Sequence, residues 1–598
     1  MWRNPRRFIF LIFLVKLGLM IRLEIKKIVL KTVGKNFGGI SAPDFSVEKP
    51  EKMEHGDYAT NVALILAKAL SARGGSVSGG KKNPMEIAEF LAKKLESKKW
   101  RAEAARPGFI NFYFKDNFLI PEIRKKINNK KAFGKVNKGR GKTVMVDYFQ
   151  LNIAKRPHIG HLRSAVIGDA LKRMFLLFGY KAVSDTHVGD WGTQFGILLL
   201  GFKEEKMNIR DKKILADPFN VLEELYKKEN EKIEADPERR EKAKLEFAKL
   251  ERGDAENRKI WKWMVDISMK NLEESAGILG LESFDEHRGE SFYGKDMPAI
   301  AALALKKRIA KKKSGAVIVD LSREGLDEAV LIKSDGASTY LLRDLATIQY
   351  RKKRWGFWKN IYVVDARQTH HFKQMFSVAA KIGFEGVGQS EHIEFGAMTF
   401  PEGKISTRKG NIISLAKLFS EAKARALAVI KEKNPDLKDT EVVAAKIGLG
   451  AIKYFDLSHN RRSDIVFRWG DALAFEGDTG PYLQYTHARL KSILRKAKKV
   501  SAPPKYFFAL EPLEHEIFSR ILAFEEAAED SLSLYMPNVL ANYLHGLAKK
   551  VNEFYHLYPV LSEQNPKKRA LRLMLVDAAA TAINKGLWCL GIESPEEM

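Results

Sequence analysis

The stretch VMVDYFQLNIAKRPHIGHLRSAVIGDALKRM, residues 144–174, decides the expected fold. Val144 to Val146 is an apolar run that predicts a buried strand. A polar turn containing Pro157 follows, and from Leu162 onward the apolar side chains recur at helical spacing. This order places residues 158–161 where a parallel strand leads into a helix. We therefore predict an α/β fold with a doubly wound parallel sheet, whose ligands bind at such junctions.

The tetrapeptide His-Ile-Gly-His at residues 158–161 suits a nucleotide. Exposed N–H groups and the macrodipole at a helix N-terminus attract phosphate. Gly160 lets a flat base approach the backbone closely, and His158 and His161 add hydrogen-bond donors. Taken alone, a pair of histidines that merely cap a helix explains so short a pattern about equally well.

A second element lies downstream, where Lys404, Arg408 and Lys409 surround Ser406 and Thr407. Such a cationic loop can hold the outer phosphates of ATP while pyrophosphate departs. A solvated basic turn is the alternative, because short Lys/Arg runs are common on surfaces. The order and separation of the two elements favour one shared site for an enzyme that activates a carboxylate with ATP. The candidate ATP-binding residues are His158, Gly160, His161, Lys404, Ser406, Arg408 and Lys409.

Both elements resemble the nucleotide signatures His-Ile-Gly-His and Lys-Met-Ser-Lys-Ser of the class I aminoacyl-tRNA synthetases. Further stretches are similar to the arginyl-tRNA synthetases in particular, and they cover nearly the whole chain. These stretches are 55–61, 107–112, 152–155, 187–196, 340–344, 480–485, 487–489 and 590–595. The resemblance implies a Rossmann-like catalytic core, an α+β N-terminal domain and an all-helical C-terminal anticodon-binding domain.

The resemblance also implies the reaction. Arginine and ATP, with Mg²⁺, would form arginyl-adenylate and pyrophosphate, and arginine would then pass to the 2′-hydroxyl of the terminal adenosine of tRNA(Arg). Activation is expected to require bound tRNA. The expected catalytic residues are His158, His161, Lys155 and Lys404. Lys155 is expected to replace the second lysine of the downstream signature, where this chain has Thr407.

Recognition of arginine requires carboxylates, because the guanidinium carries a permanent charge and only donors. Tyr340 and Asp344 stand four apart in a helical segment and share one face, where the ring can stack and the carboxylate can bond. The alternative is that Tyr340 is a core residue and that Asp344 forms an ion pair with Arg343 or Lys333. The arginine site that the resemblance implies consists of Asp147, Asn152, Tyr340, Asp344 and Gln368.

Sequence patterns divide the chain into several domains. We predict an N-terminal tRNA-binding domain over 20–135, a catalytic domain over 141–200 and 265–420, and a helical anticodon-binding domain over 421–598 without strands. A charged helical insertion, 201–264, and a second insertion, 287–335, interrupt the catalytic domain. The expected elements are helices over 58–70 and 85–95 joined by a flexible loop over 71–84, strands over 317–321, 329–332 and 361–364, and a charged helical stretch over 218–252.

The C-terminal segment combines aromatic and basic residues. Tyr482 and Tyr485 precede a basic run, so bases can stack on the rings while cations contact phosphates. A packed tyrosine pair beside a solvated basic helix is the alternative. The resemblance favours RNA binding, and the candidate tRNA-binding residues are Tyr482, Tyr485, Arg489 and Arg495.

Composition agrees with a polyanionic partner. There are 103 Lys and Arg against 74 Asp and Glu, and the net charge is +29. One cysteine, Cys589, excludes an internal disulfide and a multi-cysteine zinc site, so we expect no zinc or other protein-held metal and a cytoplasmic location. The apolar run over 8–15 is too short to span a membrane, and we expect Met20 to be the native start. By resemblance, we expect a monomer.

Three other functions are alternatives. A catalytically inactive RNA-binding relative would lose its phosphate ligands, yet His158, His161 and Lys404 are present. A nucleotidyltransferase that does not use tRNA has no reason to carry a basic helical C-terminal domain. A synthetase for another amino acid is the nearest competitor; the lack of cysteine pairs argues against zinc-bearing relatives, and the carboxylate pair argues against neutral substrates.

Overall fold

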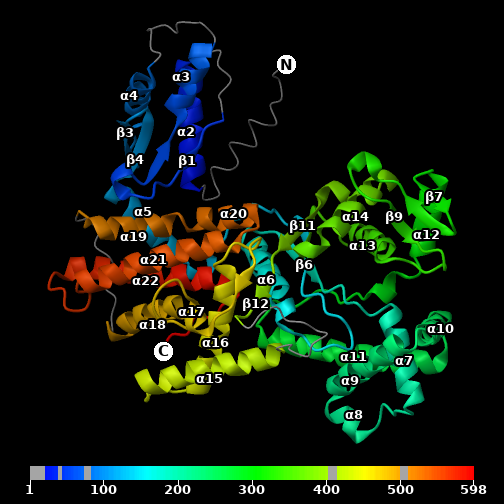
Figure 1. The fold of residues 1–598 in the computed structure, drawn as a ribbon. Coiled ribbons are helices and arrows are strands. Elements are labelled where there is room, and N and C mark those ends of the chain that lie inside the picture. Colours follow the sequence, from blue (N-terminus) through cyan, green and yellow to red (C-terminus); the bar gives the residue numbers. More distant parts are fainter. Residues whose placement is uncertain (1–19, 38–43, 73–82, 402–413, 498–508) are drawn as a thin grey trace. The chain divides into compact units, whose positions relative to one another are not determined.

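The computed structural model describes residues 20–37, 44–72, 83–401, 414–497 and 509–598. They form two compact units (Figure 1). The central unit comprises described residues of 139–474 together with 589–592. The terminal unit comprises described residues of the segment up to 138 together with 475–588 and 593–598. The predicted domain boundaries stay predictions, although residues 421–474 belong to the central unit.

A parallel sheet of four strands organises the central unit. Its strands are β5 (Thr143–Asp147), β6 (Lys181–Asp185), β10 (Lys359–Asp365) and β11 (Ser390–Phe395), in the order β11-β10-β5-β6. The predicted strands at 144–146 and 361–364 are confirmed. In this sheet β6 lies on one side of β5, and β10 and β11 lie on its other side. The carboxyl ends of β5 and β10 therefore flank the point where strand order reverses, the usual ligand position in such sheets.

The helices after these two strands begin at the same edge. β5 is followed by a loop, the short helix η4 (Ile159–His161) and α6 (Leu162–Leu177), which confirms the predicted helix. β10 is followed by η7 (Ala366–Gln368) and α14 (Thr369–Ile382). β5 is buried at Val144, Met145 and Val146, as expected for a strand inside a parallel sheet.

The first insertion is helical, as predicted. Residues 201–264 include α8 (Lys212–Ala216), α9 (Pro218–Ala235) and α10 (Glu238–Arg252); α7 (Thr193–Glu204) ends inside this range, and α11 (Ala255–Ile278) begins inside it. Asp217 caps α9 by accepting the Asn220 N–H at 3.1 Å, and Pro218 occupies the first turn, where no N–H is needed. One charged residue of α9 is fully buried. Glu229 bonds Arg239 at 2.7 Å and Lys232 at 2.6 Å, so it packs inside the insertion.

The second insertion contains a small antiparallel sheet. Its elements are η5 (Glu290–Tyr293), α12 (Met297–Lys306), β7 (Ala310–Lys313), β8 (Ala316–Val319), η6 (Ser322–Glu324) and β9 (Ala329–Ile332). β8 and β9 pair as predicted. The edge strand β7 was missed because its sequence, Ala-Lys-Lys-Lys, has no apolar alternation. Helix α13 (Tyr340–Trp355) follows, and its inner face joins α12, α14 and the small sheet in one apolar core.

The remaining elements of the central unit are mostly helical. They are η8 (Val387–Gln389), β12 (Met398–Thr399), α15 (Leu415–Lys433), α16 (Thr440–Leu457), β13 (Ile465–Val466) and α17 (Trp469–Ala472). The prediction of no strand beyond residue 420 was wrong at β13, which pairs in parallel with β12. A two-residue strand is defined by its partner backbone and leaves no periodic pattern in the sequence.

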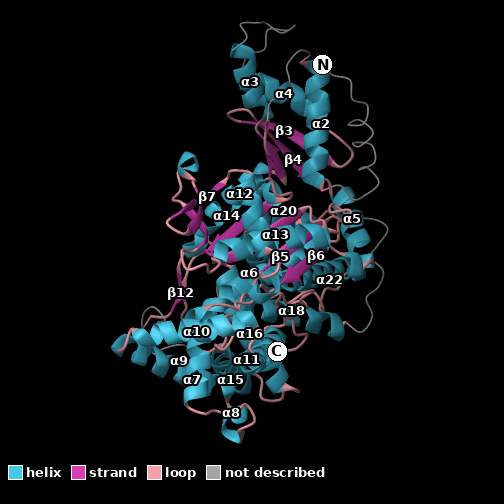
Figure 2. Cartoon of the chain, turned by 90° about the vertical axis from the view of Figure 1, so that its right-hand side faces the viewer, coloured by secondary structure: helices cyan, strands magenta, loops and turns pink. Residues whose placement is uncertain are grey.

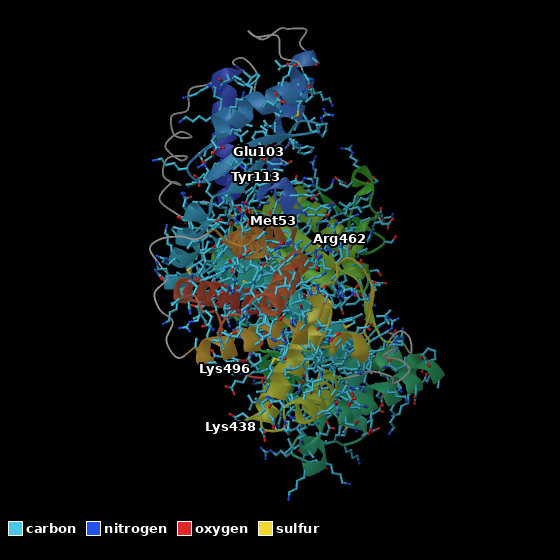
Figure 3. The ribbon with its side chains drawn as sticks, turned by 90° about the vertical axis from the view of Figure 1, so that its left-hand side faces the viewer. Met53, Glu103, Tyr113, Lys438, Arg462 and Lys496 are labelled. Atoms are coloured by element: carbon cyan, nitrogen blue, oxygen red, sulfur yellow. The ribbon has the colours of Figure 1, made fainter. Side chains whose placement is uncertain are left out.

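In the terminal unit, the N-terminal residues form a sheet packed by helices (Figure 2). The elements are α2 (Ile21–Asn36), β1 (Val47–Glu48), η2 (Met53–His55), β2 (Tyr58–Thr60), α3 (Val62–Ala72), α4 (Pro84–Leu95), β3 (Trp100–Ala105), β4 (Phe109–Phe114), α5 (Asp116–Asn128) and η3 (Lys130–Ala132). The sheet is antiparallel in the order β1-β2-β4-β3. Figure 3 shows Glu103 of β3 and Tyr113 of β4 on this sheet.

One helix boundary was predicted wrongly here. Residues 58–60 form β2, and the helix begins only at Val62. Tyr58 and Thr60 are both buried with Ala59 between them, which is the two-residue period of a strand. The helix predicted over 85–95 is confirmed by α4. Of the loop predicted over 71–84, Ser71 and Ala72 end α3, Pro84 begins α4, and 73–82 lie outside the described residues.

The C-terminal part of the terminal unit is helical, as predicted. It contains α18 (Gly480–Lys496), α19 (Pro512–Leu522), α20 (Phe524–Leu534), α21 (Pro537–Leu557) and α22 (Pro566–Cys589). Polar contacts join it to the N-terminal module: the Tyr58 hydroxyl donates to Glu526 at 2.7 Å, and Arg22 pairs with Asp530 at 2.7 Å. Within the described residues, no helix is both long enough and apolar enough to cross a bilayer.

Candidate active site

The His158–His161 turn begins the helix that follows β5. The Gly160 N–H donates to Nδ1 of His158 at 3.1 Å, and the His158 N–H donates to Nδ1 of His161 at 3.2 Å. The ring centroids lie 4.0 Å apart. Because each Nδ1 accepts a backbone proton, each neutral ring carries its own proton on Nε2. The turn therefore uses one nitrogen of each ring for folding and leaves the other as a donor.

Both histidines are uncharged at neutral pH. Burial, with help from the nearby Lys155 charge, lowers the pKa of His158 to about 4. Burial and the neighbouring His158 lower the pKa of His161 to about 3. The site thus offers neutral N–H donors at the positive end of α6, which suits the phosphate groups of a nucleotide.

The predicted phosphate loop lies outside the described residues, so Lys404, Ser406, Arg408 and Lys409 have no described geometry. The residues that directly follow this loop in the chain do have described geometry. Ser414 pairs with His158 in an antiparallel bridge, and the Leu415 N–H donates to the Pro157 carbonyl at 3.0 Å. The described residue that follows this loop thus lies beside the histidine turn, although more than 250 residues separate the two along the chain.

Lys155 belongs to a loop with unusual backbone angles. Phe149 and Ala154 have φ of 58° and 63°, values that residues with a side chain rarely adopt. The Ala154 N–H donates to Oγ of Ser268 on α11 at 2.9 Å, which stabilises the bend. Lys155 follows directly, and its ammonium lies 5.3 Å from the ring centroid of Tyr226 on α9. Burial lowers the pKa of Lys155, against the nearby charge of Glu223.

Tyr340 and Asp344 share one face of α13, as predicted. Tyr340 is 60% exposed, so it is not a core residue. Asp344 bonds Nε2 of His371 at 2.6 Å and lies 3.4 Å from Nε2 of His187. Despite burial, these hydrogen bonds hold the pKa of Asp344 below its usual value. The face therefore carries an ionised carboxylate beside an exposed ring, and the alternative pairing of Asp344 with Arg343 or Lys333 is not found.

Three ionisable residues near Asp344 were missed. Although burial opposes it, the Asp344 carboxylate raises the pKa of His187 to about 9, and it also raises that of His371. Burial raises the pKa of Glu290 to about 7 against the Arg343 charge, whose guanidinium lies 2.6 Å away. His187 opens one of the stretches that carry the resemblance. Neither spacing nor composition distinguishes Glu290 or His371.

Asp147 has a partner inside the protein. It ends β5, is fully buried, and lies 2.7 Å from the Arg351 guanidinium, which also reaches Asp185 at 2.9 Å. Gln150 donates to its other oxygen at 2.7 Å. The predicted contact of Asp147 with a substrate guanidinium stays a prediction, and here an internal guanidinium occupies that role.

Asn152 and Gln368 are exposed, and each lies beyond the carboxyl end of one of the two neighbouring strands. Asn152 lies in the loop after β5 and pairs with Gly189 in a parallel bridge. A Cβ at Gly189 would lie 2.9 Å from Oδ1 of Asn152, so a larger residue at position 189 would displace the Asn152 amide. Gln368 ends η7, just before α14. Both amides are thus available to a ligand at this edge of the sheet.

The four residues predicted to bind RNA all lie on α18, in the terminal unit. The Arg489 guanidinium lies 4.7 Å from the ring centroid of Tyr485 and 5.0 Å from that of Tyr555, and these tyrosines are 38% and 42% exposed. Tyr482 accepts a hydrogen bond from Asn552 at 2.9 Å. Arg495 pairs with Glu597 at 3.1 Å. Tyr555, on α21, was missed because it lies far along the chain from α18.

Comparison with known proteins gives a consistent result along the chain. Residues 122–469 match the catalytic domain of class I (R) tRNA synthetases, 483–598 match the DALR anticodon binding domain, and 20–114 match the arginyl tRNA synthetase N-terminal domain. The arginine–tRNA ligase of Lactococcus lactis subsp. lactis is 37% identical over 554 residues, 92% of this chain and 95% of that protein. That of Clostridium botulinum strain Alaska E43 is 37% identical over 561 residues, 94% and 97% of the two chains.

Solved structures resemble the fold over almost its full length. The arginyl-tRNA synthetase of Thermus thermophilus superposes with a TM-score of 0.80 at 27% identity and covers 97% of this chain and 100% of that one. The enzyme from Plasmodium falciparum superposes with a TM-score of 0.79 at 24% identity, over 97% and 99% of the two chains. At 24% identity, the similarity to the Plasmodium falciparum protein is evidence for the fold alone.

Proposed function

This chain belongs to the arginyl-tRNA synthetase family, and we propose how its residues divide the work of that reaction. As an arginine–tRNA ligase, it uses ATP to join arginine to tRNA. The observation that carries the assignment of residues is that one unit contains both a turn of neutral histidines and an ionised carboxylate. His158 and His161 supply the former, and Asp344 the latter.

The histidine turn would bind ATP. An oxygen of the arginine carboxylate attacks the α-phosphorus in line, a new P–O bond forms, and the bond to pyrophosphate breaks. Negative charge grows on the phosphoryl oxygens, and the Nε2–H groups of His158 and His161 and the Lys155 ammonium would stabilise it. Lys404 and its neighbours would hold the departing pyrophosphate. In the same turn, the backbone at Gly160 would lie against the adenine base of ATP.

Mg²⁺ would accompany the nucleotide. No cluster of His, Cys, Asp or Glu able to hold a metal ion is found among the described residues. Magnesium in phosphoryl-transfer sites is commonly bound through substrate phosphates and water. We therefore assign the ion to the triphosphate, where it neutralises charge, and assign no protein ligand to it.

Asp344 would be the direct carboxylate for the substrate guanidinium. Tyr340 is exposed one helical turn away and can stack on the guanidinium plane. Asn152 and Gln368 would orient the amino and carboxylate groups of arginine. Asp147 already pairs with Arg351, so we propose that it supports the site through that pair. His187 and His371 share Asp344 and would have to give up positive charge when a guanidinium arrives.

Transfer to tRNA follows activation. The 2′-hydroxyl of the terminal adenosine attacks the carbonyl carbon of the adenylate, the ester forms, and AMP leaves. The cluster of Tyr485, Arg489 and Tyr555 would receive unpaired anticodon bases, and the charge of +29 would assist binding to the polyanion. We further propose that activation requires bound tRNA and that the enzyme is a monomer in the cytoplasm.

ATP–pyrophosphate exchange tests these proposals. Purified protein receives arginine or lysine, with or without unfractionated cognate tRNA. Exchange with arginine only in the presence of tRNA would support the arginine site and the tRNA requirement. Exchange with arginine alone would leave the arginine site standing and remove the tRNA requirement. No exchange under any condition, with tRNA binding retained, would favour an inactive RNA-binding relative.

A further inference from the structure

The charged insertion holds the loop that carries Lys155. Arg156 is the main link: its guanidinium bonds both carboxylate oxygens of Asp217, at 2.7 and 2.6 Å, and its backbone N–H donates to Glu223 at 3.1 Å. Asp217 is the residue that caps α9, and Glu223 lies in the second turn of that helix. The first turns of α9 therefore bind both the side chain and the backbone of the residue next to Lys155.

Tyr226 stands one turn farther along α9 and contacts Lys155 itself. The ammonium lies 5.3 Å from the ring centroid, a distance at which the face of the ring attracts a cation. Lys155 and Tyr226 are both half-buried, so solvent weakens this attraction less than on an open surface. Leu222 and Leu225, on the inner side of the same helix, are buried and fix its orientation.

A long, flexible lysine side chain can adopt many rotamers, and an aromatic face that selects one of them reduces the entropy lost when phosphate is bound.

We propose that Tyr226 of the charged insertion is a positioning residue, which holds the Lys155 ammonium for the adenylation step. The inference rests on the proposed role of Lys155, and it gives the insertion a function in catalysis. Tyr226 itself touches no reacting atom in this scheme. Its ring, and not its hydroxyl, is the required feature, because the cation faces the π system.

Substitutions at Tyr226 separate the ring from the hydroxyl. The assay is ATP–pyrophosphate exchange with arginine varied up to saturation at saturating ATP and tRNA, and thermal unfolding checks that each variant is folded. We expect Tyr226→Leu to lower kcat by roughly 3- to 30-fold, the range of a partly buried cation–π contact, with little change in the KM for arginine. Tyr226→Phe keeps the ring and should stay within about twofold of the parent enzyme. A parallel loss in both variants would overturn the proposal.

A double-mutant cycle with Lys155→Ala tests the role of Tyr226 separately from that of Lys155. If Tyr226 acts through Lys155, Tyr226→Leu causes no further loss of kcat once Lys155→Ala is present. An equal loss in both backgrounds would show that Tyr226 acts elsewhere and would overturn the inference alone. If Lys155→Ala leaves kcat unchanged, the proposed role of Lys155 falls, and the positioning role falls with it.

Discussion

The backbone N–H of His158 donates to Nδ1 of His161 at 3.2 Å, so a side chain of the nucleotide signature completes the turn that presents it. The fold uses Nδ1, and the proposed role in nucleotide binding falls to Nε2. His161→Asn places an amide oxygen near the position of Nδ1 and has no equivalent of Nε2. We expect the thermal unfolding midpoint to change little while pyrophosphate exchange falls roughly 100-fold, the usual effect of losing one transition-state donor.

His161→Ala is the matched control for that prediction, because it removes both nitrogens. It should lower the unfolding midpoint as well as the exchange rate. Full exchange activity in His161→Asn would mean that Nε2 is not a phosphate donor, and a lower midpoint in that variant would mean that the amide does not replace Nδ1.

Arginine binding should release protons near neutral pH. Although burial opposes it, Asp344 raises the pKa of His187 to about 9, so His187 is charged before substrate arrives. A guanidinium that takes over Asp344 removes the group that holds this proton. We expect roughly half to one proton released per arginine at pH 7.5, measured by calorimetry in buffers of different ionisation enthalpy.

The variant His187→Asn provides the comparison for proton release. It removes the main titrating group and should reduce the number of protons released. Binding heat that is independent of the buffer in the parent protein would contradict the proposed exchange of partners at Asp344.

Sequence patterns predicted the features that depend on residues close together in the chain. The strand at 144–146, the turn at His158 and the shared face of Tyr340 and Asp344 all follow from local period and spacing. Asp147 shows the limit of this reasoning. Its partner Arg351 is 204 residues away, and only the packing of α13 on the sheet brings them together. Tyr555 reaches Arg489 across 66 residues for the same reason.

Asp147→Asn should act mainly on stability. The change leaves the buried Arg351 guanidinium with Asp185 as its one remaining carboxylate partner among the described residues. Breaking a buried ion pair on one side typically costs about 3–5 kcal/mol, and the second carboxylate should limit the loss to roughly 2–4 kcal/mol. Thermal unfolding measures it, and Asp185→Asn should behave alike. A selective loss of arginine affinity at unchanged stability would instead make Asp147 a direct ligand.

The contact between the N-terminal module and α19 should weaken at alkaline pH. His515 lies 3.1 Å from Asp57 and 3.1 Å from Asp116, and despite burial these carboxylates raise its pKa to about 9. This value is above the ordinary 6.5. The charged histidine therefore stabilises the contact fully below about pH 6.5, and the contribution disappears as pH rises through 9.

Hydrogen exchange in β4 and α19 measures this pH effect, because the Phe114 N–H donates to Asp57 at 2.7 Å. Protection should decrease between pH 7 and 9.5 in the parent protein by about 2 kcal/mol, and His515→Gln should show a weaker pH dependence. Lys49 also titrates in this range, because burial lowers its pKa to about 8. Comparison of the parent protein with His515→Gln separates the contribution of His515 from that of Lys49. Identical pH profiles would exclude His515 as the titrating group.

Tyr555 should contribute to tRNA affinity although it lies outside the α18 motif. Its ring is 42% exposed and lies 5.0 Å from the Arg489 guanidinium, which makes a flat platform for an unpaired base. We expect Tyr555→Ala to weaken binding of full-length tRNA(Arg) by roughly 5- to 100-fold, the range of one stacked base. Tyr555→Phe should bind normally, and a minihelix that contains only the acceptor stem should not distinguish the variants. Equal losses with tRNA and with the minihelix would show that the ring acts on folding and not on the anticodon loop.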